Sequence, residues 1–385
     1  NMTNMFLSAN ALSDENKCAI HTSFSSNPNW PYDWSDTCPF QPQTTAELQT
    51  AVDLWVSDNA SALAIYGEIN TWDVSLVSDM SELFKDKTTF NDDISSWDVA
   101  NVTNMQWMFK LATNFNQDLS SWNVSSVDNM DLMFSEATSF NGNISNWDVS
   151  NVTSMSSMFH AAESFNQDIG GWNVSSVDNM GYMFNGASNF NQDLLSWDVS
   201  NITSMIGMFR WTSFNGNISN WDVSSVYNMV AAFQNCPNFD QDLSNWDVSS
   251  VTNMQEMFEN ATSFNGDLSS WDVANVTNME YMFYNAWNFN QDLSGWDVSN
   301  VTNMTGIFSG ASNFNQNISS WDVSSVTTMR QMFFFTSSFN QDLSTWIVSS
   351  VTDMYRMFRS ATSFNSDLSG WDISSVAEMT EMFMD

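Results

Sequence analysis

The chain has 385 residues, and its 8 Lys and Arg stand against 44 Asp and Glu, which gives a formal net charge of −36. Nucleic acid and anionic membrane surfaces are therefore very poor partners, because charges of the same sign repel. No apolar run reaches the roughly 18 residues of a membrane-spanning helix, so no membrane insertion is expected. Because the chain begins at Asn1 without a signal-peptide pattern, we expect a processed product or a fragment.

Residues 1–43 form an extension ahead of the repeats, and two of the three cysteines lie in it. Cys18 and Cys38 flank the loop-rich stretch CAIHTSFSSNPNWPYDWSDTC, and we expect a disulfide between them in an oxidising compartment. Two unpaired thiols are the alternative. Cys236 stands where other repeats carry Ala, which indicates a small buried side chain rather than a reactive thiol.

Residues 44–71 precede the first repeat and are expected to form a helical cap. A stack of repeats leaves an open edge at each end, and a cap covers it. Within 46–66, the apolar residues available for the first repeat are Leu48, Val52, Trp55, Leu63 and Tyr66.

From residue 72 onward the sequence repeats. The period is marked by Trp72, Trp97, Trp122, Trp147, Trp172, Trp197, Trp221, Trp246, Trp271, Trp296, Trp321, Trp346 and Trp371. Every interval is 25 residues except the one from Trp197 to Trp221, which is 24 because MFRWTSFN (208–215) lacks one residue. Such regularity predicts stacked units with one continuous core rather than several globular domains.

Each unit reads approximately LSSWDVSNVTNMxxMFxxAxxFNQD. The piece LxxWxVxxV has the spacing of a leucine-rich-repeat strand, and MxxMF has the spacing of one or two helical turns, with a preceding Thr such as Thr103 as its cap. We therefore predict an α/β solenoid: a leucine-rich-repeat-like right-handed coil of about thirteen 25-residue units, with a parallel sheet and short helical turns, over residues 72–385.

Three further columns of the repeat are interpreted as structural. The Met columns alternate with Phe at helical spacing, so we interpret both as core, with soft-metal binding by Met as the alternative. An Asn column follows the Phe column, and its amides are expected to hydrogen-bond one another and the turn backbone: Asn91, Asn116, Asn141, Asn166, Asn191, Asn215, Asn265, Asn290, Asn315, Asn340 and Asn365.

These units resemble the BspA-like surface-protein repeats, a relative of the leucine-rich repeat found in bacteria, mycoplasma lipoproteins and protists. The resemblance rests on WDVSxVTxMxxMFxxAxxFNxD and covers residues 44–385. It implies a solenoid opened by an amino-terminal helix, secretion or surface display, and a role in adhesion or recognition. It implies no catalytic residues.

Two acidic columns run along the repeats. The residue after Trp is acidic at Asp73, Asp98, Asp148, Asp198, Asp222, Asp247, Asp272, Asp297, Asp322 and Asp372. A second column precedes the Leu or Ile of the repeat, as at Asp118 and Asp242. Carboxylates in adjacent coils, about 4.8 Å apart, repel one another. Either hydrogen bonds from backbone N–H groups and screening by salt offset this repulsion, or Ca²⁺ bridges neighbouring carboxylates of the first column as weak sites.

Asn replaces Asp at several positions of both columns and creates N-x-S/T sequons there. In a secreted eukaryotic chain these would be candidate N-linked glycan sites. The sequons are Asn1, Asn59, Asn101, Asn123, Asn143, Asn151, Asn173, Asn201, Asn217, Asn260, Asn275, Asn300, Asn303 and Asn317. The alternative is that an Asn- and Ser-rich repeat generates sequons by composition alone.

The sequence predicts no enzyme, because no nucleophile elbow, phosphate loop or zinc spacing is present. We expect an extracellular or cell-surface structural or adhesive glycoprotein without a cofactor other than Ca²⁺. Residues 1–11 resemble a spare half-unit while the chain stops half-way through one, which predicts head-to-tail assembly into a filament or surface layer. The alternative is a recognition module that binds carbohydrate, protein or Ca²⁺ through its Asp/Ser face.

Overall fold

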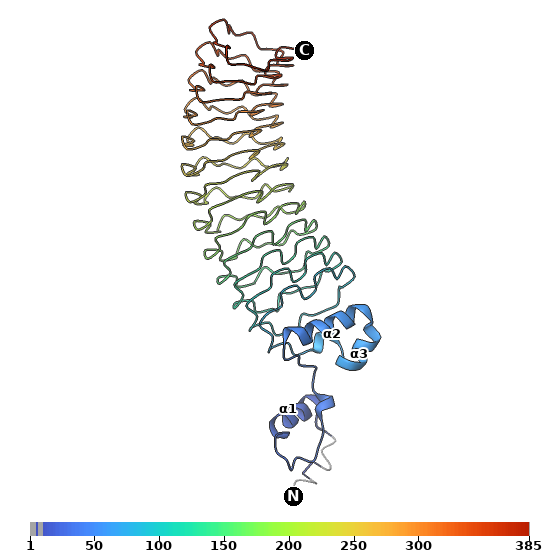
Figure 1. The fold of residues 1–385 in the computed structure, drawn as a ribbon. Helices are drawn as coiled ribbons and strands as arrows, with labels where there is room; N and C mark the ends of the chain where they lie inside the picture. The colour runs from blue at the N-terminus through green and yellow to red at the C-terminus, as the bar shows by residue number, and fades with distance from the viewer. Residues whose placement is uncertain (1–4, 7–10, 385) are drawn as a thin grey trace.

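The computed structural model describes residues 5, 6 and 11–384. A small amino-terminal module is followed by a pair of helices, and from about residue 72 the chain winds into one curved column of stacked coils (Figure 1). The amino-terminal module and the last coils lie at opposite ends of the molecule (Figure 1). Among the described residues, no helix has the length and apolar character needed to cross a bilayer.

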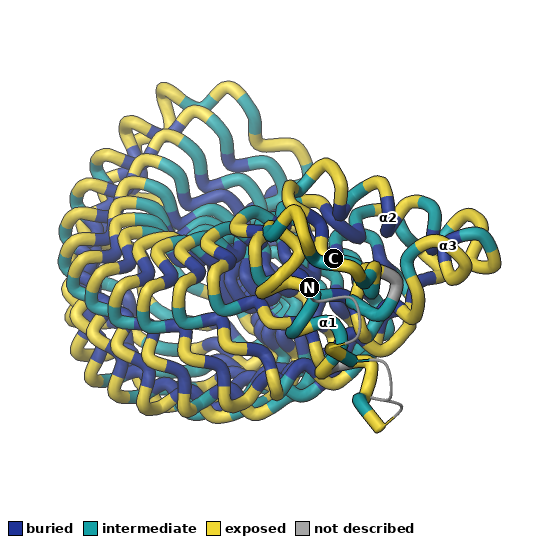
Figure 2. Tube along the Cα trace, turned by 90° about the horizontal axis from the view of Figure 1, so that it is seen from below, coloured by how far each residue is buried: buried dark blue, intermediate teal, exposed yellow. Residues whose placement is uncertain are grey.

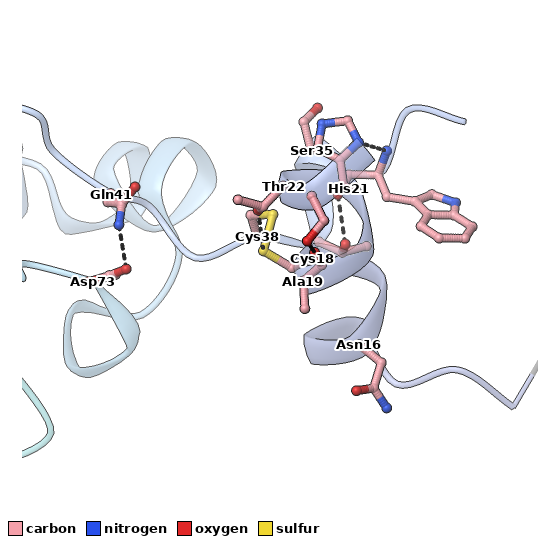
Figure 3. Close-up of a disulfide and its surroundings, with 12 residues drawn as sticks. Asn16, Cys18, Ala19, His21, Thr22, Ser35, Cys38, Gln41 and Asp73 are labelled. Carbon is pink, nitrogen blue, oxygen red and sulfur yellow. Dashed lines mark hydrogen bonds between the residues drawn. A yellow bond between two sulfur atoms is a disulfide. The ribbon is translucent and has the colours of Figure 1, made fainter. Parts of the chain in front are cut away.

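The amino-terminal module consists of helix α1 (Asp14–Phe24) and the 3₁₀ turn η1 (Ser35–Thr37). The helix begins after Ser13, whose hydroxyl accepts a hydrogen bond from the backbone N–H of Asn16 at 3.3 Å. Cys18 on α1 and Cys38 after η1 form a disulfide, with their Cα atoms 4.8 Å apart (Figure 3). The disulfide therefore ties the loop-rich stretch back onto α1.

Most of residues 1–11, the expected assembly arm, lies outside the described residues, but Phe6 is described. Its ring lies edge-on to those of Trp30 and Trp34, with centroids 6.1 and 5.5 Å away. The backbone N–H of Phe6 donates to the hydroxyl of Tyr32 at 3.1 Å. Phe6 thus belongs to an aromatic cluster within its own module, and head-to-tail assembly stays a prediction.

Helices α2 (Thr45–Ser57) and α3 (Asn59–Tyr66), with the 3₁₀ turn η2 (Ile69–Thr71), form the cap on the first coil. Thr44 begins α2 by accepting the N–H of Glu47 at 3.2 Å. Asp58 lies between the two helices and caps α3 through the N–H of Ser61.

The buried face of the cap is largely the one expected from the sequence. Leu48, Val52 and Trp55 on α2 are buried, and Tyr66 is half-buried against the core. Leu63, however, is 41% exposed, so the expectation for it was wrong. The expected single helix is broken at Asp58 into α2 and α3. Leu63 lies on α3, so its side chain does not continue the buried face of α2.

Each coil of the column is a chain of tight turns. In the coil of residues 94–118, backbone N–H groups donate to the carbonyl three residues earlier, in the pairs Trp97–Ile94, Val102–Val99, Met108–Met105, Ala112–Phe109 and Phe115–Ala112. Every residue of these pairs is apolar and buried. A hydrogen-bonded four-residue turn brings its first and last Cα atoms within about 7 Å of each other, so both side chains can enter the same core. Apolar residues three apart therefore mark turns here.

The predicted α/β solenoid with a parallel sheet and helical turns is wrong. The described residues contain no strand, and no helix lies within the described repeats. Among the described residues, β-pairing between neighbouring coils is limited to isolated parallel bridges at the residue before the first Met, as between Asn104 and Asn129. Pairing cannot extend into a strand, because one turn ends at Val102 and the next begins at Met105. Thr103, expected to cap a helix, instead donates its backbone N–H to the carbonyl of Ser78 in the preceding coil at 2.9 Å.

Two positions in each coil adopt, in nearly every case, the left-handed backbone conformation. They are the residue before the second Met, such as Trp107 with φ 60°, and the residue before the Ala, such as Leu111 with φ 61°. Outside glycine this conformation costs about 1–2 kcal/mol per residue. The N–H groups of Trp107 and Leu111 donate to carbonyls of the next coil at 2.9 and 2.8 Å, so bonds between coils offset the strain.

The core is a set of aromatic stacks that run the length of the column, and it lies inside the ring of coils (Figure 2). Tryptophan rings of neighbouring coils lie parallel, as for Trp122 and Trp147 with centroids 6.5 Å apart. Phenylalanine rings do the same, as for Phe109 and Phe134 at 5.4 Å. The Met columns are buried among them, which confirms that Met and Phe are core residues.

Each tryptophan of the second and later coils also donates a hydrogen bond to the coil before it. Trp221 Nε1 lies 2.9 Å from the carbonyl oxygen of Leu194, 27 residues earlier, and Trp246 Nε1 lies 3.2 Å from that of Ile218. The Leu194 carbonyl also accepts the backbone N–H of Trp197, which closes a turn. One oxygen thus joins the turn of its own coil to the indole of the next, which only Trp among the large apolar residues can supply.

The Asn column also joins coils. The side-chain oxygen of Asn290 accepts the backbone N–H of Asn315 at 2.9 Å, and the same bond recurs from coil to coil. Asp240 stands in this column and accepts the N–H of Asn265 at 2.9 Å. The column is structural, as expected, and what it needs is an acceptor rather than an amide.

The short coil is accommodated at Thr212, which takes the place of Ala. Its hydroxyl donates to the carbonyl of Phe209 at 2.6 Å and accepts the N–H of Phe214, so it tightens the chain where one residue is missing. Cys236 in the next coil is fully buried and lies 3.4 Å from that hydroxyl. Burial also raises the pKa of Cys236 to about 12, and the complete burial of the side chain confirms the predicted small buried residue.

Candidate functional surface

The acidic column after the tryptophans is held by local hydrogen bonds. One carboxylate oxygen of Asp148 accepts both the hydroxyl and the backbone N–H of Ser150, at 2.6 and 3.1 Å. Bonding to Ser150 keeps the pKa of Asp148 below its ordinary value. The backbone bond recurs at all ten aspartates predicted as weak calcium ligands: Asp73, Asp98, Asp148, Asp198, Asp222, Asp247, Asp272, Asp297, Asp322 and Asp372.

The asparagines in this column make the same bonds without the charge. Asn173 Oδ1 accepts the hydroxyl and the N–H of Ser175 at 2.8 and 3.2 Å. The column therefore serves the turn as an acceptor, as the hydrogen-bond alternative expected. In the part of the chain that the structure describes, no group of three or more His, Cys, Asp or Glu side chains could hold a metal ion. Calcium at these aspartates stays a prediction.

The second acidic column behaves alike. Asp118 and Asp242 accept the N–H groups of Ser120 and Ser244 at 2.8 and 2.9 Å, and Asn143 accepts that of Ser145 at 3.1 Å. The two columns thus form a uniform Asp/Ser surface whose side chains are used by their own turns.

The predicted glycan sites differ in whether the side-chain nitrogen Nδ2, which would carry the glycan, already donates a hydrogen bond. In the group Asn101, Asn151, Asn201, Asn275 and Asn300, Nδ2 donates to a backbone carbonyl of the preceding coil. In the group Asn123, Asn143, Asn173, Asn217 and Asn317, only Oδ1 is used by the local turn. Asn260 and Asn303 are half-buried and donate Nδ2 to neighbouring side chains, Asn59 is exposed, and Asn1 lies outside the described residues. Glycosylation stays a prediction.

A different surface varies from coil to coil. We name it the turn face: residues 81, 82, 85 and 86 of the first coil and their equivalents in each later coil, which are the x positions of MxxMFxx. Six of the chain's 8 basic residues lie on it: Lys85, Lys110, Arg210, Arg330, Arg356 and Arg359. So do eight aromatic residues: Trp107, Tyr182, Trp211, Tyr281, Tyr284, Phe334, Phe335 and Tyr355.

Turn-face side chains interlock with those of neighbouring coils. The guanidinium carbons of Arg330 and Arg356 lie 4.0 and 4.6 Å from the ring centroid of Tyr355. A Cβ atom on Gly207 would lie 2.5 Å from the ring of Tyr182, so this coil needs glycine where its neighbour has tyrosine. Gln234 donates to the carboxylate of Glu259, and burial raises the pKa of Glu259 above its ordinary value.

The turn face was not predicted from the sequence, because the predicted sites were chosen among residues that recur in every coil, such as the Asp/Ser columns. The signal was present in the sequence, since six of the eight Lys and Arg residues fall at the variable positions of MxxMFxx. Reading the repeat for the positions that change, rather than for those that recur, would have found it.

Comparison with known protein families supports the repeat organisation of the chain. A family model described as a mycoplasma protein of unknown function, DUF285, matches residues 55–151, 142–231, 208–304 and 287–385. The four matches overlap and together span the end of the cap and the whole column. Comparison with the curated proteins finds no match. With more than half of its length matched, the chain belongs to the DUF285 repeat family, in line with its resemblance to BspA-like repeats.

Proposed function

We propose that this chain is a cell-surface or secreted recognition protein whose column of coils is a scaffold and whose turn face contacts the partner. The observation that carries this proposal is the contrast within each repeat. The Trp, Val, Phe, Asn and Asp columns recur almost unchanged, whereas turn-face residues range from Gly to Arg and Trp. A scaffold needs uniform side chains, but recognition needs different ones along the surface.

The composition of the turn face supports contact with a partner. Trp, Tyr and Arg contribute most to binding energy in protein interfaces, and all three are frequent on this face. The turn face also presents charges of both signs, because its six basic residues stand beside acidic ones such as Glu82 and Glu381, whereas the Asp/Ser surface carries only negative charge. Charges of both signs can fix the orientation of a partner.

A location outside the cytosol is part of the proposal. The Cys18–Cys38 disulfide supports it, because disulfides persist in oxidising compartments. The Asp/Ser surface is a weaker candidate for recognition, since it is uniform and its polar groups bond within their own turns.

Two matched sets of variants test the proposal. One set replaces turn-face aromatics (Trp107→Ala, Trp211→Ala and Tyr355→Ala), and the other replaces Asp/Ser-surface carboxylates (Asp98→Asn, Asp198→Asn and Asp297→Asn). Binding of each chain to immobilised extracellular-matrix proteins and polysaccharides is measured. We expect retention to fall in the first set and to persist in the second. Retention lost only in the second set would contradict the proposal.

A further inference from the structure

Two exposed aromatic side chains stand two coils apart at the edge of the turn face. Trp287 is 54% exposed and Phe335 is 53% exposed. The coil between them contributes Gly310 and Ser312, so no large side chain rises between the two rings. Two coils correspond to about 10 Å along the column.

The gap between the rings is maintained by glycine. Gly310 has φ 71°, and a Cβ atom there would lie 2.2 Å from Oδ1 of Asn285. Asn285 is itself fixed, because its Nδ2 donates to Oδ1 of Asn260 at 2.9 Å. The neighbouring amides therefore require glycine at 310, and a groove results.

The groove has the size and the chemistry of a small-ligand site. Its volume is about 420 Å³, within the roughly 300–1,000 Å³ of typical ligand pockets. Its lining combines the two aromatic side chains with small polar residues and carries no charge: Asn285, Trp287, Gly310, Ser312, Phe335 and Ser337. A neutral lining in so acidic a chain favours a neutral ligand with both apolar faces and hydroxyl groups.

We propose that this groove binds a neutral oligosaccharide. The apolar face of one sugar ring stacks on Trp287 and that of another on Phe335, while sugar hydroxyl groups between them bond the hydroxyls of Ser312 and Ser337. Aromatic rings supply large, rigid apolar faces for such stacking. The inference rests on the proposed recognition function and names the ligand class for one part of the surface.

The test uses the full chain and a panel of immobilised neutral hexasaccharides built from glucose, mannose or N-acetylglucosamine. We expect at least one of them to bind, and we expect Trp287→Ala and Phe335→Ala each to weaken that binding about tenfold or more. Tyr227→Ala is the matched control, because Tyr227 is also exposed, at 53%, but lies off the turn face. This control should bind within about twofold of the unchanged chain.

Three results would overturn the inference. One is that no neutral hexasaccharide binds, and a second is that both groove variants bind as well as the unchanged chain. The third is that the groove variants lose only a protein partner found in the matrix-binding experiment, which would make the groove a protein-docking site. In that third case the proposed recognition function still stands, so the two failures are distinguishable.

Discussion

At the scale of single residues, the repeat uses side chains that do two things at once. The indole of Trp221 packs between coils and donates to the carbonyl of Leu194. The carboxylate of Asp148 closes a turn through Ser150, and Asn173 does the same without charge. The recurring Trp, Asp and Asn residues are thus explained by hydrogen bonds that apolar substitutes could not make.

Trp221→Phe tests the role of the indole. We expect the free energy of unfolding to fall by about 1–3 kcal/mol, because one buried hydrogen bond is lost and a cavity remains where the larger ring was. Urea denaturation followed by circular dichroism measures it. Trp211→Phe, at a 55% exposed position, should change stability by less than about 0.5 kcal/mol. Equal effects at both positions would contradict the role.

At the scale of elements, consecutive turns replace strand and helix. The left-handed residues permit this, since a turn with positive φ at its third residue redirects the chain every few residues. Most of these positions are not glycine, yet Gly186 and Gly310 occur in the same column as Ala161. This position of the repeat therefore tolerates the strain of a left-handed residue other than glycine, because hydrogen bonds between coils offset it.

Ala161→Gly tests the strain. Ala161 has φ 52°, so glycine should leave the chain equally stable or up to about 1 kcal/mol more stable, as relief of strain exceeds the added freedom of the unfolded chain. Ala274→Gly is the control, because Ala274 is not among the positive-φ residues, and it should cost about 0.5–1 kcal/mol. Thermal unfolding of both variants decides the matter, and a loss at Ala161 as large as at Ala274 would count against the strain.

At the scale of the whole molecule, the net charge and the hydrogen-bonded carboxylates oppose each other. Hydrogen bonds from the hydroxyl and the N–H of Ser299 lower the pKa of Asp297, and they outweigh the neighbouring charge of Asp322, which raises it. A lowered pKa means that the folded chain binds the carboxylate form more favourably than the unfolded chain does. This stabilisation is present above the ordinary pKa of 3.8 and is lost as the pH falls through the lower folded values.

The free energy of unfolding should therefore fall as the pH drops from about 4 to 2, which urea titrations at a series of pH values would measure. Asp148→Asn, Asp198→Asn and Asp247→Asn combined should make the fall shallower, since all three carboxyls have lowered pKa values and asparagine does not titrate. A chain that becomes more stable in acid would show that charge repulsion dominates instead.

The period, the buried columns, the Asn column and the place of the short coil could be predicted from the sequence, because each depends on residue types that recur at a known interval. The disulfide could be predicted because Cys18 and Cys38 flank one loop-rich stretch. The sequence could not separate turns from strand and helix, since apolar residues three apart, such as Met105 and Met108, suit all of them. That distinction depends on contacts between coils, because the left-handed residues of the turns are held by hydrogen bonds to the next coil, as from the N–H of Trp107 to the carbonyl of Asp131. The tertiary structure also brought Trp287, Gly310 and Phe335 to one groove, since their order along the chain does not reveal which side chains stand clear of the column.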